Sequence, residues 1–257
     1  MTGQTRWAQK MDRHHSAIRN VGYLILPLLI CANHGVQGDE SEVFGKLAAG
    51  NAEWGVLHRQ VASTASKADS KVQALTWNAY DPVVIVARPG DEMQIASIAL
   101  GEVVQFGTVP ADAVTEGGEA LQFLSKQIAA NENDYRPRLA LAILLRYSKV
   151  GSLFPLREME CGRQIEQVLR LEPECILART ERAGLLAQRG HTSEAIKELN
   201  QVLTKKPTSA YLFYVRGLTF LQDGNPERAR QDFQQSLELA PKSWHFRSSV
   251  EEAMAGQ

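Results

Sequence analysis

Three prolines recur at a strict and equal spacing, at Pro173, Pro207 and Pro241. Each follows a stretch in which apolar residues recur with the period of a helix, and proline ends a helix because it interrupts the hydrogen-bond ladder. A constant spacing of about 34 residues indicates an internal repeat, in which each unit is one supersecondary element that stacks on the next. This repeat constrains the fold more than any other feature of the sequence.

The last two units carry small and large apolar residues at the same phases. In the shared register Ala195 matches Ala229, and Leu199 matches Phe233. The alanines let the second helix of a unit approach the first closely, and the larger residues four positions later fill the space beyond. Each unit is therefore predicted to be a pair of packed helices.

Turn and cap residues support the same division. Gly190 and Gly224 lie between the two predicted helices of their units, and glycine permits the tight reversal that such a turn requires. Asn225-Pro226 predicts the start of the last second helix, because asparagine caps a helix and proline fits its first position.

The stretch 208–241 closely resembles the tetratricopeptide repeat family. The residues at the family's signature phases are Phe213, Gly217, Phe220, Ala229, Phe233, Ser236 and Pro241. The unit at 174–207 keeps several of these phases. Arg182 in this unit and Arg216 at the same phase of the last unit stand where the family often has an apolar residue. The resemblance implies an all-α fold, a solenoid of antiparallel helix pairs. The residues upstream add an expected N-terminal helical extension and an N-terminal signal segment.

These observations predict the following organisation. The chain divides into a signal peptide at 1–38, a mainly helical region at 39–118 and a repeat domain at 119–257, with repeats near 135–173, 174–207 and 208–241 and a capping helix at 242–254.

The segment 1–38 resembles a secretion signal. Basic residues precede an apolar run at 21–32, which is shorter than the roughly 20 residues that cross a bilayer as a helix. Val36 and Gly38 fit the small-residue positions before a cut ahead of Asp39. We therefore expect an extracytoplasmic protein, periplasmic or secreted. The alternatives are a membrane anchor formed by the uncleaved run at 21–32 and lipidation of Cys31.

Composition and charge exclude a disordered chain and argue against a nucleic-acid partner. Hydrophobic residues make up 44% of the chain and charged residues 22%, so the chain can bury a core. The segment 1–38 holds four of the 28 basic and one of the 29 acidic residues, which leaves 24 against 28 in the remainder. A mildly acidic body does not attract a phosphate backbone, so no nucleic-acid partner is expected.

Residues 39–118 do not follow the repeat. The stretches 41–50 and 52–77 are predicted as helices. The run 83–87 is short and β-branched, which suits one strand or one buried turn. Because no second strand is evident nearby, helix or irregular structure is expected there.

The same region offers one rival resemblance. The stretch 81–107 is similar in rhythm to the strand and helix that open the flavin-binding domain of certain FAD-linked oxidases. Such domains continue with a glycine-dense loop whose amides hold a pyrophosphate. Here the glycines are few and the stretch that follows contains Asp112 and Glu116, so a flavin-dependent enzyme is the less favoured alternative.

No motif for catalysis or metal binding is present. His58, His191 and His245 are each solitary, and no nucleophile or phosphate-loop signature occurs. We therefore expect no enzyme activity, no cofactor, no metal and no small-molecule substrate. Cys161 and Cys175 should lie roughly 20 Å apart along a helix, too far for a disulfide.

The resemblance also implies a binding face. In this family the first helix of each pair lines a concave face, on which a partner peptide lies. Carried onto this sequence, the face includes Arg136, Arg146, Tyr147, Thr180, Gln188, Tyr211, Tyr214, Leu218 and Gln222. Tyrosine and arginine carry binding energy well because they bring a large area with a polar tip. The alternative is that the tyrosines pack between adjacent helices.

Together these features predict an exported, non-catalytic scaffold or adaptor that binds a protein or peptide. The alternative is an envelope assembly or regulatory subunit held at the membrane by its leader or by a lipid.

Overall fold

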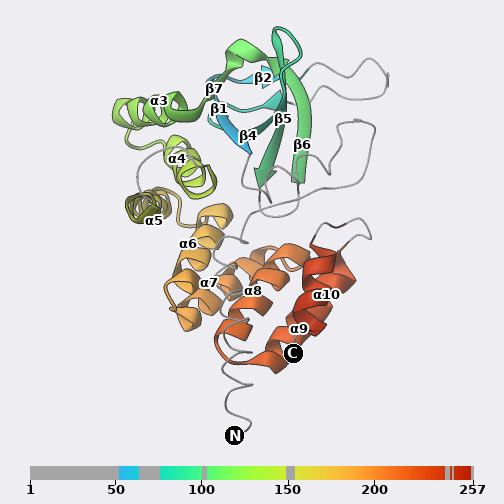
Figure 1. The fold of residues 1–257 in the computed structure, drawn as a ribbon. Helices are drawn as coiled ribbons and strands as arrows, with labels where there is room; N and C mark the ends of the chain where they lie inside the picture. Colours follow the sequence, from blue (N-terminus) through green and yellow to red (C-terminus); the bar gives the residue numbers. More distant parts are fainter. Residues whose placement is uncertain are drawn as a thin grey trace, which may run out of the picture. The chain divides into compact units, whose positions relative to one another are not determined.

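The computed structural model describes residues 52–63, 76–99, 103–148, 154–240, 244 and 246–255. They fall into two compact units (Figure 1). The sheet unit comprises the described residues up to Ala178 together with Trp244, and the repeat unit comprises those from Arg179 onward. The predicted signal segment at 1–38 and the predicted helix at 41–50 lie outside the described residues.

The described part of 39–118 is built from strands, so the prediction of a mainly helical region is wrong there. The strands are β1 Glu53–Leu57, β2 Val61–Ala62, β3 Thr76–Trp77, β4 Pro82–Ala87, β5 Glu92–Ala99, β6 Val103–Pro110 and β7 Val114–Glu116, with the short 3-10 helix η1 Ala111–Ala113 before β7. Five of them form an antiparallel sheet in the order β6-β5-β4-β1-β7, and β2 pairs with β3. An all-α fold therefore does not describe the whole chain.

The burial of β4 explains why its sequence did not distinguish a strand from a buried turn. Val83 and Ile85 belong to a buried cluster on one face of the sheet, and Val84 between them is also fully buried. The helix that follows at Tyr135–Tyr147 contacts both β1 and β4. A strand covered on both faces shows no alternation of polar and apolar residues, and this removes the usual signal.

The flavin resemblance rests on a strand followed by a helix, and the structure has a different arrangement. The stretch Glu92–Ala99, which would be that helix, is strand β5 and pairs antiparallel with β4. The prediction that 83–87 is helical or irregular is also wrong, because these residues belong to strand β4. β4, β5 and β6 form a meander, in which the backbone groups bond to neighbouring strands.

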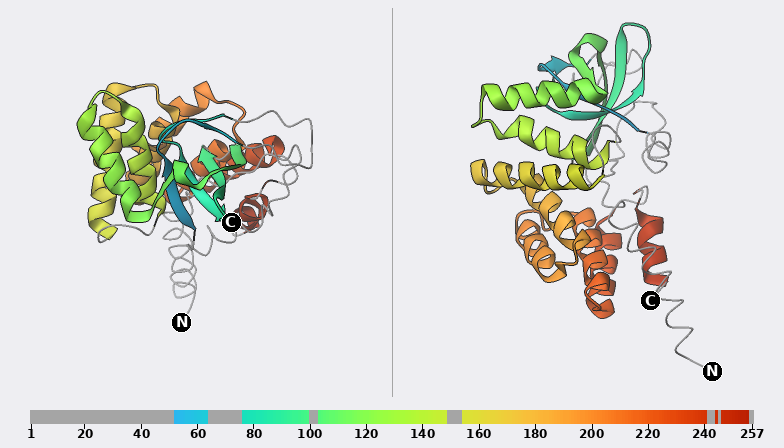
Figure 2. Two further views of the ribbon diagram at one scale, coloured as in Figure 1. Left: turned by 90° about the horizontal axis from the view of Figure 1, so that it is seen from above. Right: turned by 60° about the vertical axis from the view of Figure 1, so that its left-hand side comes forward.

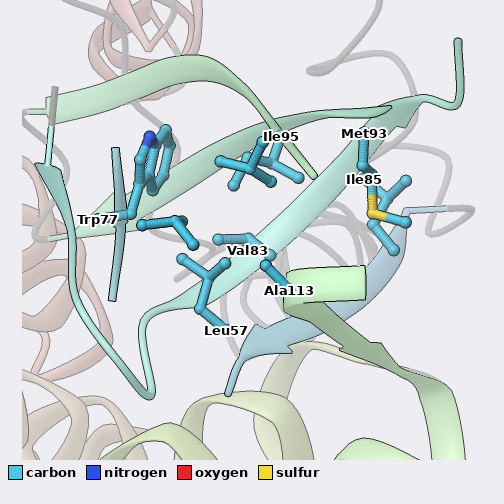
Figure 3. Close-up of a cluster of buried hydrophobic side chains, with 9 residues drawn as sticks. Leu57, Trp77, Val83, Ile85, Met93, Ile95 and Ala113 are labelled. Carbon is cyan, nitrogen blue, oxygen red and sulfur yellow. The ribbon is translucent and has the colours of Figure 1, made fainter. Parts of the chain in front are cut away.

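The core of the sheet lies between β1, β4, β5 and the β2–β3 pair. Figure 3 shows its side chains pointing toward one another over the strands. The buried members are Leu57, Val61, Trp77, Val83, Ile85, Met93, Ile95, Val109 and Ala113. Burial of apolar area on this scale is the main stabilising contribution to such a sheet.

A glycine in β1 determines how closely β7 approaches. A Cβ at Gly55 would lie 2.7 Å from Val114 Cγ1 and 3.0 Å from the carbonyl oxygen of Thr115. Only glycine leaves room for β7 at this distance. The position of β7 matters because it borders the cavity described below.

Helices α3 Gly117–Ala130, α4 Tyr135–Tyr147 and α5 Phe154–Leu171 complete the sheet unit. α3 packs against β1, β7 and α4, and α4 packs along α5. The sheet and the first helices therefore form one compact unit, whereas the sequence predicted a domain boundary at residue 118. Cys161 in α5 is buried, Cys175 is half-buried, and both thiols are free.

The repeat unit is a series of antiparallel helices. α6 Ile176–Gln188 continues into it from the sheet unit, and α7 Thr192–Lys205, α8 Ala210–Gln222, α9 Pro226–Leu239 and α10 Arg247–Ala255 follow. Neighbours along the chain pack together from α7 to α10, and Figure 2 shows α8 and α9 side by side. No helix in the described ranges is both long and apolar enough to span a bilayer.

The turns inside the helix pairs confirm the role predicted for glycine. Gly190 and Gly224 have φ of 82° and 76°, in the left-handed region that suits glycine. Beyond Gly224, the Asn225 N–H donates to the Phe220 carbonyl at 2.8 Å, and the Asn225 side chain accepts from the Arg228 N–H. The turn and the cap together reverse the chain and start α9.

Candidate partner-binding surfaces

Three predicted contact residues on α8 are buried, and the C-terminal segment covers two of them. Tyr211, Tyr214 and Leu218 are 1%, 3% and 8% exposed. The ring of Phe246, just before α10, lies 5.6 Å from that of Tyr211 and 5.4 Å from that of Tyr214. The three side chains are therefore not open to a partner in this structure, and the tyrosines pack between helices as the alternative interpretation has it.

Tyr214 is a buried titratable group of this face. Burial raises the pKa of its hydroxyl to about 12, and a hydrogen bond with Ser249 of α10 opposes that rise only in part. The side chain is thus a neutral packing group that ties α8 to α10.

The other predicted residues of the repeat unit lie on α6 and at the end of α8. Thr180 is buried, whereas Gln188 and Gln222 are half-buried. The Gln222 side-chain amide donates to the Ala187 carbonyl at 2.7 Å and so connects α8 with the end of α6. Gln188 and Gln222 are therefore the predicted residues that keep a surface position in this unit.

Arg136 is an exposed cation near the start of α4. Its Nε and Nη2 donate to the two carboxylate oxygens of Asp134 at 2.9 and 2.6 Å, and its Cζ lies 5.5 Å from the centre of the Tyr80 ring. These hydrogen bonds lower the pKa of Asp134, which also caps α4. Arg136 is held in place and remains accessible.

Arg146 and Tyr147 attach α4 to the sheet. The Tyr147 ring stacks on Trp54 of β1 with centroids 6.1 Å apart and an interplanar angle of 23°. Arg146 Nε donates to the Tyr147 hydroxyl at 3.2 Å. The sequence did not indicate this contact, because Trp54 was expected in a helix, far from a recognisable partner. The nine predicted residues are thus divided between the two units, three in the sheet unit and six in the repeat unit.

A cavity in the sheet unit has no counterpart in the sequence prediction. Its volume is about 710 Å³, and it lies beside β1, β7 and the start of α3. The residues that line it are Ala52, Glu53, Trp54, His58, Asp112, Val114, Thr115, Glu116, Gly117, Glu119 and Ser148. In the sequence, Asp112 and Glu116 served only as an argument against a phosphate-binding site and were not assigned to a cavity.

Ion pairs balance part of the acidity of this cavity. The Arg88 guanidinium bridges Glu53 of β1 and Glu116 of β7, at 2.5 Å from Glu116 Oε2. Arg59 pairs with Asp112 at 2.7 Å. Within the described ranges, no three His, Cys, Asp or Glu side chains converge in a way that could hold a metal ion.

Two arginines that depart from the family pattern form equivalent ion pairs inside the helix pairs. Arg216 donates through Nε and Nη2 to both oxygens of Asp232, each at 2.7 Å. Arg182, at the same phase of the preceding unit, donates to Glu198 at 2.6 Å. Both pairs join the first helix of a unit to its second, so the apolar contact of the family is replaced by a charged one.

Comparison with known proteins agrees with the repeat register. A family profile described as tetratricopeptide repeat matches residues 180–243. The human protein named Tetratricopeptide repeat protein 13 is 34% identical over 107 residues, which cover 40% of this chain and 12% of that protein. The chain therefore matches only a small part of that relative's length.

Solved structures give a weaker likeness. A thermophilic tetratricopeptide repeat protein of Thermus thermophilus has a TM-score of 0.46 at 18% identity, over 54% of this chain and 73% of that one. MamA of Desulfovibrio magneticus has a TM-score of 0.43 at 20% identity, over 53% and 78%. Scores this low do not define the arrangement of the helices.

The equal proline spacing, the glycine turns within the helix pairs and the matching family profile agree. Residues 180–243 match a tetratricopeptide repeat profile, and the structure forms antiparallel helix pairs there.

Proposed function

We propose that this chain is an exported, non-catalytic scaffold that binds a protein or peptide partner through the helix pairs of its repeat unit. The observation that carries the proposal is the repeat itself, with helix pairs in a regular register that a tetratricopeptide profile matches. Stacked pairs of this kind present an extended surface formed by successive first helices.

The contact surface centres on Gln188 of α6 and Gln222 of α8. The two glutamines occupy the same phase in successive units and are half-buried. A glutamine amide both donates and accepts, which suits the backbone groups of an extended peptide. Tyr211 and Tyr214 support this surface from below and do not contact the partner, because Phe246 covers them.

Affinity capture from the native host tests this surface. The chain, tagged at its C-terminus, is compared with a Gln188→Arg/Gln222→Arg variant, which places two long cations on the surface. Gln234→Arg on the exposed side of α9 is the matched control. We expect one partner to be captured by the wild type and the control and lost from the double variant. Equal capture by all three would show that the partner binds elsewhere.

Export is tested on the same purified chain. The signal interpretation predicts a mature chain that begins at Asp39, measured by intact mass. A chain that keeps residues 21–32 and sediments with membranes would favour the anchored assembly or regulatory subunit instead. A mass that begins at Cys31 with an added lipid would favour the lipidated form.

A further inference from the structure

One stripe of α8 runs from covered tyrosines to an open glutamine. Its members, which recur at helical spacing, are Tyr211, Tyr214, Leu218 and Gln222. The two tyrosines lie under the C-terminal segment 246–255, whereas Gln222 keeps a surface position. Gln222 is eight residues from Tyr214, which is about 12 Å along the helix. A partner that lies along α8 from Gln222 therefore reaches the C-terminal segment.

The C-terminal segment binds this stripe as an amphipathic helix binds a groove. Phe246 and Val250, four positions apart, are 3% and 0% exposed. Glu251 and Glu252 on the other side of α10 are exposed. The Phe246 ring packs against the rings of both tyrosines of α8. The chemistry that fits this stripe is therefore an aromatic residue followed, one helical turn later, by an aliphatic residue.

The attachment of this segment is short and partly polar. α10 has nine residues, and isolated helices shorter than about 12–15 residues are marginal in water, so α10 depends on its docking. A hydrogen bond joins Ser249 to Tyr214. Arg247 Nη2 donates to the carbonyls of Leu237 and Ala240 at 3.1 and 3.0 Å. A terminal element held in this way belongs to the less stable parts of a fold, which open locally.

The guanidinium of Arg247 is incompletely satisfied in this docked position. Its Nε is buried and has no hydrogen-bond partner among the described residues. A buried donor without an acceptor destabilises the state that buries it, and release of the segment returns this donor to water. The docked state is therefore less stable than its apolar contacts alone would make it. A helix that offers the same apolar side chains without this arginine can compete with the segment.

We propose that the segment 246–255 is an intramolecular competitor, which a helix of the partner displaces from α8. The partner helix carries an aromatic residue and an aliphatic residue four positions later, and these take the places of Phe246 and Val250 over the two tyrosines. This inference rests on the proposed function and deepens it. The docked segment leaves Gln222 as the contact on α8, and its release adds the tyrosines to the same contact.

A fluorescent peptide with the sequence of residues 244–257 tests the displacement on the full chain. Its anisotropy is titrated with the wild-type chain and with the Phe246→Ala chain, whose own segment is weakened. We expect the variant chain to bind the peptide at least about tenfold more tightly, because the apparent affinity falls with the fraction of chains in which the stripe is open. The same peptide with alanine in place of its phenylalanine should bind neither chain. Equal binding of the first peptide by both chains would overturn the proposal.

A milder variant keeps the test decisive if Phe246→Ala unfolds the last helices. Ser249→Ala removes the hydrogen bond to Tyr214 and leaves the aromatic packing in place. It should raise the affinity for the peptide about fivefold, which corresponds to one hydrogen bond. Glu251→Gln, on the exposed side of α10, is the matched control and should bind the peptide as the wild type does. Unchanged affinity after Ser249→Ala would contradict a segment that can be displaced.

Sedimentation velocity separates a partner helix from a second copy of this chain. We expect the wild-type chain to sediment as a monomer with or without the peptide. A dimer that dissociates when the peptide is added would show that the segment of a second copy occupies α8, and this would overturn the proposal of a partner helix. Because the peptide titration needs no natural partner, failure of the displacement is distinguished from failure of the capture experiment at Gln188 and Gln222.

Discussion

The two repeats at 174–207 and 208–241 fill the same space between their helices with different residues. The first has Ala183 and Leu199 at the phases where the second has Gly217 and Phe233. In the second unit the fit is so close that a Cβ at Gly217 would lie 2.6 Å from Phe233 Cε1. What the two repeats share is therefore the combined volume of the facing pair, because a close-packed interior tolerates compensating changes better than single ones.

The aromatic ring should make the second repeat the more sensitive to truncation. Phe233→Ala should cost about 4 kcal/mol of unfolding free energy, against about 3 kcal/mol for Leu199→Ala, because the larger side chain leaves the larger cavity. Both residues are fully buried, so exposure does not account for the difference. Urea unfolding followed by helical circular dichroism measures the two values. A smaller cost at Phe233 would show that the second repeat relaxes around the lost ring.

Thr180 and Tyr214 occupy the same phase of the two repeats, and only the tyrosine can titrate. The stability of the second repeat should therefore depend on alkaline pH, whereas that of the first should not. The pKa of Tyr214 rises from its ordinary value of 10.0 to about 12 on burial, so the folded state favours the neutral form. Its contribution to stability is complete below pH 10 and is lost as pH rises to about 12. The loss amounts to at most about 3 kcal/mol.

Tyr214→Phe provides the test of that response. The variant lacks the hydroxyl, so its unfolding free energy should fall less between pH 10 and pH 12 than that of the wild type. Parallel pH profiles for the two proteins would show that Tyr214 does not control the alkaline limb.

Loss of one arginine should destabilise the ion pair of the second repeat more than that of the first. Asp232 and Arg216 are 8% and 19% exposed in their side chains, so Arg216→Met leaves a buried carboxylate without its main partner. Glu198 in the first repeat keeps Arg179 at 3.6 Å when Arg182 is replaced. We expect a cost of about 2–3 kcal/mol for Arg216→Met and about 1 kcal/mol for Arg182→Met.

Amide hydrogen exchange, measured separately in α7 and α9, shows which repeat each variant destabilises. Exchange should speed up in α9 after Arg216→Met, with a smaller change in α7 after Arg182→Met. Equal acceleration in both helices would mean that Arg179 does not support Glu198.

Gly217 and Phe233 of the second repeat can be replaced by the alanine and leucine that the first repeat has at these phases. Gly217→Ala should destabilise by about 1–2 kcal/mol, because overpacking outweighs the gain in helix propensity. With Phe233→Leu as well, the second repeat carries the alanine and leucine of the first, and the added methyl group should become stabilising. A double-mutant cycle measures this change of sign. Additive effects would show that the two residues do not share one space.

Much of the repeat region could be predicted from the sequence, including features that depend on single residues. Gly190 and Gly224 adopt the left-handed turns expected between helices, and Asn225 caps α9 as its sequence indicates. These features depend on neighbours within a few residues, which the sequence displays directly. The role of Arg182 and Arg216 could not be predicted, because their acidic partners lie 16 residues away on a different helix.

The candidate surfaces were predicted less well than the helices that carry them. The family resemblance assigned Tyr211 and Tyr214 to a binding face, although the capping helix predicted at 242–254 contains Phe246, whose ring packs against both of them. It also assigned Tyr147 to a binding face, whereas the structure stacks it on Trp54. In both cases the covering residue comes from a different element, so only packing decides what remains exposed.

The sequence by itself determined the helix pairs of this protein, because each pair is complete within one repeat unit and its contacts recur with the period of the repeat. Only the tertiary structure decided the sheet, where β1 lies between β4 and β7 and where Val83, Val84 and Ile85 are buried from both sides. The physical reason is the range of the stabilising contacts. Helical hydrogen bonds join residues four apart, whereas the β1–β7 pair joins Gly55 to Glu116 and leaves no periodic trace in either strand.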